Sequence, residues 1–429
     1  MMLVMPESVE PKQTLRTKPG LSLLSASAIS IGATVGAGIF AVTGVAAGLA
    51  GSALLISLLL AAGATIFTAL SFIQLIAWKP AEGSIYFYAR QLISPFTGFL
   101  VGWMWVVSNL FSGAVVALSF VHYLVELTGL RTIKVNLIAA ALIIIFTAIN
   151  SMDIEKSTAV NNLLVFLKLF ILLIFFVVGL FFIKPENLQP LHFSPPGIVL
   201  GAAIIFFAFQ GFARVAIVAE EVNNPARNVP RAIIISLSVS ALIYFLVTFV
   251  ALGLVGAAKL SRSGAPLALA IRQTGWNWMV SLVSLGGLLA TASVLLTAIL
   301  GISRMLFAMA REEDLPSFLK SVHPNFRTPL KGVWISGLIM AVLAYCFDLA
   351  RVASISSFSL LFYYSLANIS ALRLEKKAKK YPEAIPYLGL ILCLGIGLSL
   401  LFSRASNLTI ILTCLAAGSL IFFIKSRIR

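Results

Sequence analysis

The sequence has few charged residues and few side chains that could ligate a metal or act as a nucleophile. Charged residues make up 11% of its 429 residues, whereas soluble domains average about 25%. Its three cysteines lie in apolar stretches without CxxC spacing, so neither a metal site nor a disulfide framework is indicated. A phosphate-binding loop is also missing. These absences exclude an ordinary soluble domain and argue against a nucleotide-driven pump.

Long apolar blocks dominate the sequence instead. Blocks of roughly 20 apolar residues match a hydrocarbon core about 30 Å thick, and only helices or closed barrels satisfy their backbones in lipid. The blocks are too long and too uniformly apolar for barrel strands. We therefore predict an all-α integral membrane protein with about twelve transmembrane helices. The predicted spans are 22–47, 49–76, 94–125, 135–150, 159–183, 196–219, 231–257, 276–309, 332–347, 351–372, 385–403 and 405–425.

Basic residues outnumber acidic ones by 31 to 15, and their positions predict an orientation. With the N-terminus inside, 21 basic residues fall in cytoplasmic segments and eight in outer ones. The positive-inside rule then places both termini in the cytoplasm of a multi-pass cell-membrane protein, with 1–20 as a cytoplasmic tail. The charge is therefore a topology signal and not a sign of a nucleic-acid partner. The basic cluster 373–380 is also suited to contact membrane lipid headgroups.

Two spans interrupt their own apolar pattern. The first carries three glycines within seven residues, at Gly32, Gly36 and Gly38. Glycine in a helix interior costs roughly 0.5–1 kcal/mol relative to alanine, so this stretch can unwind. A small-residue packing face is the alternative explanation. The sixth span sets Gln210 and Gly211 inside an apolar run, and irregular backbone survives in a membrane only where it lines a cavity or is buried in protein.

Interruptions five spans apart favour a five-plus-five inverted repeat with discontinuous helices 1 and 6 and a central site. Half-helix N-termini offer free N–H groups to a carboxylate. Free carbonyls suit an ammonium group, so such a site recognises a zwitterion. The predicted parts are the first repeat, 21–183, the second repeat, 184–372, and 373–429, which holds the inner loop, the last two spans and the tail.

Lys168 stands near the middle of the fifth span. A charge at mid-bilayer costs at least about 2.5–3.5 kcal/mol on insertion scales. One interpretation is a structural lysine bonded to the carbonyls of a broken helix. The other is a group that loads and releases a proton, because removal from water disfavours the charged ammonium.

Several segments together resemble the amino acid–polyamine–organocation transporter superfamily, of the type with a lysine in span five. The resemblance covers nearly the whole chain. The matching segments are GATVGAGIF at 32–40, AEGSIYFYAR at 81–90, FFAFQGF at 206–212, AEEVNNPARNVPRAI at 219–233 and SRMLFAMAR at 303–311, with DLP at 314–316 and HP at 323–324.

The resemblance implies a role for backbone groups at both interruptions, with Phe207 as an aromatic lid. The amides implied to hold the substrate carboxylate are those of Gly36, Ala37 and Gly38. The carbonyls implied to hold the substrate ammonium are those of Thr34, Phe207 and Gln210. The partners implied for Lys168 are the carbonyls of Gly32 and Val35 and the hydroxyl of Ser293, with Thr291 and Thr297 as neighbouring candidates.

The sequence departs from the family pattern after Gly211. Many relatives have an acidic residue where Ala213 stands here, and Arg214 follows it. The missing acid weakens the case for cationic substrates. Arg214 suits either an inner gate, pairing with Glu220 or Glu221, or the lining of a water-filled cytoplasmic vestibule.

These features predict a proton-coupled symporter of neutral amino acids that works by alternating access, with the proton as coupling ion and no other cofactor. Spans one, two, six and seven would rock against spans three, four, eight and nine. Exchange of amino acids or amines without net proton flux remains the alternative. An enzyme is not expected, because the spans contain no His/Cys/Asp/Glu constellation. A channel is not expected either, because no ring of charges or filter repeat occurs.

Overall fold

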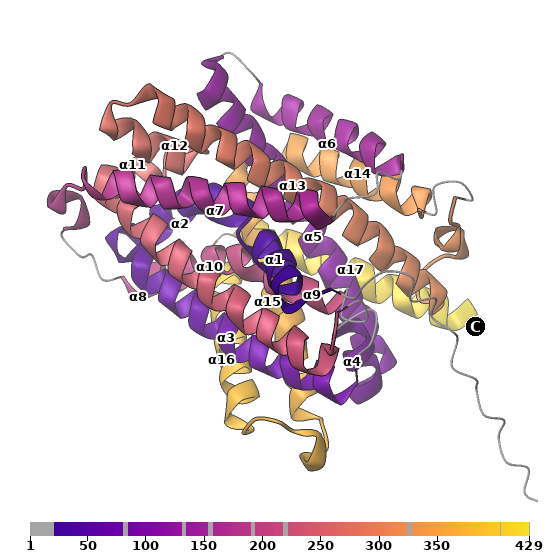
Figure 1. The fold of residues 1–429 in the computed structure, drawn as a ribbon. Coiled ribbons are helices and arrows are strands. Elements are labelled where there is room, and N and C mark those ends of the chain that lie inside the picture. Colours follow the sequence, from indigo (N-terminus) through magenta and orange to yellow (C-terminus); the bar gives the residue numbers. More distant parts are fainter. Residues whose placement is uncertain are drawn as a thin grey trace, which may run out of the picture.

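A computed structural model describes residues 21–79, 85–130, 134–152, 158–189, 194–217, 222–323, 328–403 and 405–428. Almost all of this chain is helical (Figure 1). In the first half the helices are α1 Leu23–Thr34, α2 Ala37–Ala50, α3 Leu54–Trp78, α4 Ile85–Leu92, α5 Pro95–Thr128, α6 Val135–Ser151, α7 Thr158–Leu180, α8 Pro195–Phe206 and α9 Arg214–Ile217. In the second half they are α10 Pro225–Val255, α11 Ala257–Leu260, α12 Pro266–Ile271, α13 Asn277–Arg311, α14 Leu330–Cys346, α15 Leu349–Leu372, α16 Ala384–Ser403 and α17 Ala405–Ile428.

The protein is an all-helical membrane protein, as the apolar blocks predicted. Nine helical stretches of the described chain are long and apolar enough to cross a membrane. The first of them, Leu23–Trp78, covers the first two predicted spans. Two shorter apolar helices, α6 and α14, coincide with the fourth and ninth predicted spans. The total of twelve crossings stays a prediction.

Helix α5 lies at the centre of the bundle. It packs against α13, α15, α14 and α6. Of its most apolar stretch of 18 residues, 83% is buried inside the protein. The corresponding share for α17 is 17%, so that helix lies at the periphery, where Figure 1 shows it in yellow beside α5. Helices α6 and α14, each of 17 residues, pack against one another at one side of the molecule.

The first predicted span is broken into two helices. Helix α1 ends at Thr34 and α2 begins at Ala37, so Val35 and Gly36 are not helical. Gly36 takes φ −119° and ψ −136°, and the chain changes course there. Helix α1 packs against α10 and α7, while α2 packs against α8. Both halves are therefore held inside the bundle, where irregular backbone is tolerated.

The sixth predicted span is also irregular. Helix α8 ends at Phe206, a 3₁₀ segment η3 runs over Phe207–Ala213, and α9 follows from Arg214. A 3₁₀ stretch this long within a span marks strain or a hinge, because its hydrogen-bond geometry is poorer than that of an α-helix. Segment η3 packs against both α1 and α2. The two irregular segments therefore meet.

Helix α10 begins earlier than the sequence predicted. We expected the seventh span to start at 231, but α10 starts at Pro225 and has Pro230 inside it. Proline at the first turn is compatible with a helix because the N–H it lacks has no helical partner there.

Helix α4 is fixed to the end of α13 by a buried polar cluster. Arg90 donates to Asp314 Oδ2 at 2.7 Å, and the Tyr86 hydroxyl donates to the same oxygen at 2.6 Å. Burial, then the hydrogen bond and charge of Asp314, raise the pKa of the Tyr86 phenol above its ordinary range. Burial alone would lower the pKa of Arg90, but the Asp314 carboxylate raises it. The cluster therefore holds a neutral phenol and a charged guanidinium on one carboxylate.

Candidate functional site

The two irregular segments touch through glycine backbones. A Cβ atom placed on Gly211 would lie 2.2 Å from both the Ala33 carbonyl carbon and the Thr34 nitrogen. One placed on Gly38 would lie 2.4 Å from the Ala208 Cα atom. Side chains at these two positions would force the segments apart. Glycine is therefore required at each contact because there is no room for a Cβ atom.

The three amides assigned to a substrate carboxylate lie at the start of α2. The amide of Gly36 donates to the Thr34 carbonyl at 2.8 Å. Ala37 and Gly38 are in the first turn of α2, where N–H groups have no partner within their own helix. Ala37 and Gly38 are both buried, so this helix start lies inside the bundle. This helix start favours a negatively charged group.

The carbonyls assigned to a substrate ammonium are partly engaged by hydroxyl groups. Tyr244 on α10 donates to the Thr34 carbonyl, and Tyr364 on α15 donates to the Gln210 carbonyl at 3.5 Å. The side-chain amide of Gln210 donates to Ser112 Oγ on α5 at 2.9 Å. Phe207 is 1% exposed at the start of η3. The structure therefore brings the predicted residues of both segments to one place.

Lys168 contacts two of its three predicted partners. Its Nζ atom donates to the Gly32 carbonyl at 3.2 Å and to Ser293 Oγ at 3.0 Å, and the residue is 2% exposed. Among the described hydrogen bonds there is none from Lys168 to Val35. The neighbouring candidates Thr291 and Thr297 donate to carbonyls of their own helix.

The break in the first span explains why the carbonyl of Gly32 is available. In an unbroken helix it would accept from the amide of Gly36. That amide turns to Thr34 instead, because α1 ends there. Lys168 supplies the missing donor from α7. A cation at the C-terminal turn of a helix also interacts favourably with the helix dipole.

Tyr244 was missed by the sequence reasoning. It is completely buried on α10, and its hydroxyl lies between the two irregular segments, bonded to the carbonyls of Thr34 and, at 3.0 Å, Ala208. A spacing signal was present, because hydroxyl residues recur every fourth position along an apolar helix. These residues are Ser236, Ser240, Tyr244 and Thr248, and all four are buried.

Arg214 is the first residue of α9, directly after η3. It is partly exposed, and its Nη1 atom donates to the Thr297 carbonyl of α13 at 3.4 Å. No carboxylate among the described residues forms an ion pair with it. The predicted partners Glu220 and Glu221 lie outside the described residues.

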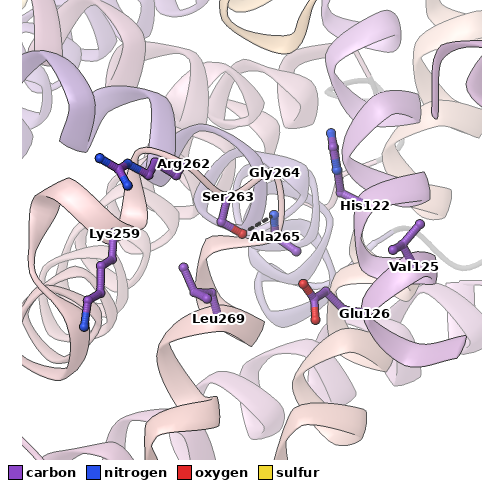
Figure 2. Close-up of a pocket in the computed structure, with 9 residues that line it drawn as sticks. All are labelled: His122, Val125, Glu126, Lys259, Arg262, Ser263, Gly264, Ala265 and Leu269. Carbon is purple, nitrogen blue, oxygen red and sulfur yellow. Dashed lines mark hydrogen bonds between the residues drawn. The ribbon is translucent and has the colours of Figure 1, made fainter. Parts of the chain in front are cut away.

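A separate pocket of about 430 Å³ lies between the end of α5 and the loop that joins α11 to α12. Figure 2 shows Lys259 and Arg262 on one side of it, and His122 and Glu126 of α5 on the other. Glu126 forms an ion pair with Arg272. None of the predicted site residues lines this pocket.

Comparison with known proteins now identifies the family. A family model described as amino acid permease matches residues 21–424, almost the whole chain. The chain belongs to the amino acid permease family. This membership makes the protein a membrane transporter of the superfamily predicted from its motifs, and it confirms that the protein is not an enzyme.

Three relatives resemble this permease over most of its length. An uncharacterized transporter of Mycobacterium tuberculosis is 36% identical over 389 residues, covering 90% of this chain and 87% of the relative. A methylthioribose transporter of Bacillus subtilis is 31% identical over 431 residues, covering 95% and 93%. The branched-chain amino acid permease of the same organism is 31% identical over 442 residues, covering 96% and 93%. The permease is therefore a transporter of amino acids or related solutes.

Proposed function

We propose that this permease is a proton-coupled symporter of neutral amino acids that works by alternating access. The observation that carries the proposal is the position of Lys168. Its ammonium group joins α7 to the C-terminal turn of α1 and to Ser293 of α13, next to the break between α1 and α2. A buried cation at this place can control whether α1 stays attached to α13.

Coupling follows from the chemistry of that amine. When protonated, Nζ forms charge-assisted hydrogen bonds with Gly32 and Ser293, and these are roughly twice as strong as neutral ones. Loss of the proton removes the charge and weakens both bonds. Helix α1 is then freer to move away from α13, which opens the site. Protonation from outside and release to the cytoplasm would therefore drive substrate inward.

The proposed substrate site is the junction of the two irregular segments. Its carboxylate end is the start of α2, at the amides of Ala37 and Gly38. Its ammonium end is the pair of carbonyls at Thr34 and Gln210, where an ammonium group would replace or share the hydroxyl donors. Neutral side chains fit best, because no acid among the described residues accompanies this junction. The relative named for branched-chain amino acids is consistent with this substrate class.

The proposal includes the architecture predicted from the sequence. Twelve spans would form two inverted repeats over 21–183 and 184–372, with both termini in the cytoplasm. The breaks support this arrangement because they fall in corresponding spans, at α1–α2 and at η3.

Uptake into proteoliposomes tests the proposal. An inward proton gradient should drive accumulation of leucine or valine with no amino acid inside. Lys168→Ala should abolish this accumulation and leave binding or exchange partly intact, while Lys320→Ala, at an exposed position, should behave like the wild type. Uptake that needs internal amino acid and ignores the gradient would show an exchanger instead. Unchanged accumulation by Lys168→Ala would remove the lysine from the mechanism.

A further inference from the structure

Arg214 carries a charge inside the bundle that the proposed coupling mechanism does not use. A guanidinium group stays protonated in proteins and offers five N–H donors. The single hydrogen bond described for its side chain goes to the Thr297 carbonyl at 3.4 Å, a long contact. A charge held in a membrane span is costly and typically marks a substrate pathway. The donors of Arg214 are therefore available to a ligand.

Arg214 lies beside α13 and Trp105 of α5. A Cβ atom on Gly301 would lie 3.3 Å from the ring of Trp105 on α5 and 3.9 Å from Arg214 Nη1. Glycine at this position lets the indole and the guanidinium approach α13 closely. Trp105, Arg214 and Gly301 are all partly exposed. The guanidinium of Arg214 is therefore accessible beside this part of α13.

One face of α13 leads from the Lys168 contact to Arg214. Ser293, Thr297 and Gly301 recur at four-residue spacing and are partly exposed, and Arg304 beyond them is exposed. Ser293 accepts from Lys168, and Thr297 accepts from Arg214 one turn later. The route thus runs from the proposed site toward the end of α13 that is predicted to be cytoplasmic.

The charges along this route are positive. Lys168 faces it from α7 and Arg214 from α9, and no acid of the described chain bonds to either residue. A carboxylate is attracted to such a region and a cation is repelled.

We propose that Arg214 binds the substrate carboxylate on the cytoplasmic side of the central site and excludes substrates with a net positive charge. The inference rests on the proposed function and says which substrates the site rejects: it takes amino acids with no net charge and excludes cationic ones. Arg214 binds the amino acid as it leaves the start of α2. A bidentate guanidinium–carboxylate contact suits this step.

The experiment compares uptake of leucine and lysine by the wild type, Arg214→Gln and Arg214→Lys in proteoliposomes. The wild type and Arg214→Lys should reject lysine, because both keep the charge. Arg214→Gln should admit lysine, and its KM for leucine measured from the cytoplasmic side should rise about tenfold, the effect of one lost charged hydrogen bond. If Arg214 were merely structural, Arg214→Gln would leave the ratio of lysine to leucine uptake unchanged. The difference between the KM for leucine measured from the cytoplasmic side and that measured from the outer side would also stay the same.

A second variant keeps the test decisive if Arg214→Gln does not fold. Ala213→Asp places a carboxylate next to Arg214 without removing it, and it should also admit lysine. Rejection of lysine by whichever of these two variants folds overturns the inference about Arg214. Failure of the wild type to transport any amino acid overturns the proposed function instead, so the two failures are distinguishable.

Discussion

At the scale of single residues, the site is made of backbone groups whose ordinary helical partners are missing. Gly32 loses the amide of Gly36 and receives Lys168 in its place. Thr34 and Ala208 share the hydroxyl of Tyr244. A hydroxyl group has one proton, so it cannot bond fully to both carbonyls. The two carbonyls therefore share one hydroxyl donor, with the Gly36 amide as a further donor to Thr34, and a substrate ammonium group with three N–H bonds would add donors here.

Replacing Tyr244 by phenylalanine should separate stability from ligand binding. The substrate-free protein should lose roughly 1–3 kcal/mol, because the buried Ala208 carbonyl loses this hydroxyl donor and the Thr34 carbonyl keeps only the amide of Gly36. The stabilisation produced by a bound amino acid should increase, because its ammonium group then replaces the donor that the hydroxyl supplied. Thermal unfolding with and without leucine measures both effects.

Tyr123→Phe is the matched control for this prediction. Tyr123 is also fully buried, and its hydroxyl donates to the carbonyl of Phe40 at 2.9 Å, away from η3. Its removal should lower stability without increasing the response to leucine. An equal response in the two variants would show that Tyr244 plays only a structural part.

The pairing of Lys168 with Gly32 and Ser293 could be predicted from the sequence, because a mid-span charge must find polar partners and the family pattern indicates which ones. Two features could not be predicted: that none of the described hydrogen bonds joins Lys168 to Val35, and that Tyr244 lies between the two irregular segments. Both depend on where the amide of Gly36 points after α1 ends, and that direction is set by tertiary packing around the break.

At the scale of helices, the two irregular segments are held together by contacts that admit no side chain. Gly211→Ala should destabilise the protein by roughly 1–3 kcal/mol through overpacking and should reduce substrate binding, because the new Cβ atom would separate η3 from α1. Unfolding in detergent and a leucine binding assay measure the two effects.

Gly63→Ala on α3 is the control for Gly211→Ala. No atom lies within 4 Å of the Cβ position at Gly63. This substitution should raise stability by roughly 0.5–1 kcal/mol, because alanine is the better helix former. If both variants behaved alike, the contact at Gly211 would not determine the geometry of the site.

The attachment of α4 to α13 predicts a loss of stability at alkaline pH. The pKa of Tyr86 is raised in the folded protein, whereas an unfolded tyrosine ionises near pH 10. Above about pH 10 the unfolded chain therefore binds fewer protons than the folded one, and the free energy of unfolding falls. Tyr86→Phe should remove this part of the pH dependence, as measured by unfolding between pH 8 and 11. An identical pH profile for both proteins would contradict it.

The positions of the helices followed from hydropathy, because twenty apolar residues fit one crossing of a bilayer. The attachment of α4 could not be predicted from hydropathy, since Arg90 of α4 bonds to Asp314, which is distant in sequence. The early start of α10 was also missed, because Pro225 and Pro230 suggested a loop. Both features depend on contacts or on capping and not on periodicity.

At the scale of the whole molecule, orientation in the membrane can be tested with a native cysteine. Cys346 is exposed at the last position of α14, the predicted outer end of the ninth span. An impermeant maleimide should modify it in intact cells, whereas Cys393 is buried and should react only after unfolding. Cys346→Ser should abolish the signal. Modification of Cys346 in inverted vesicles alone would reverse the orientation and place both termini outside.

The helices α6 and α14, the fourth and ninth predicted spans, are short for a membrane crossing. Seventeen residues at about 1.5 Å each extend roughly 25 Å, less than the ~30 Å hydrocarbon core. The amide of Asn136 on α6 bonds to the carbonyls of Ala344, Tyr345 and Phe347, which fixes the two helices at one end. If both cross the membrane, as the sequence predicts, local thinning of the bilayer beside this pair would relieve the mismatch, at a cost that grows with each ångström. Acyl-chain length in the surrounding membrane would then contribute to the energy of this face of the transporter, and thinner membranes would favour it.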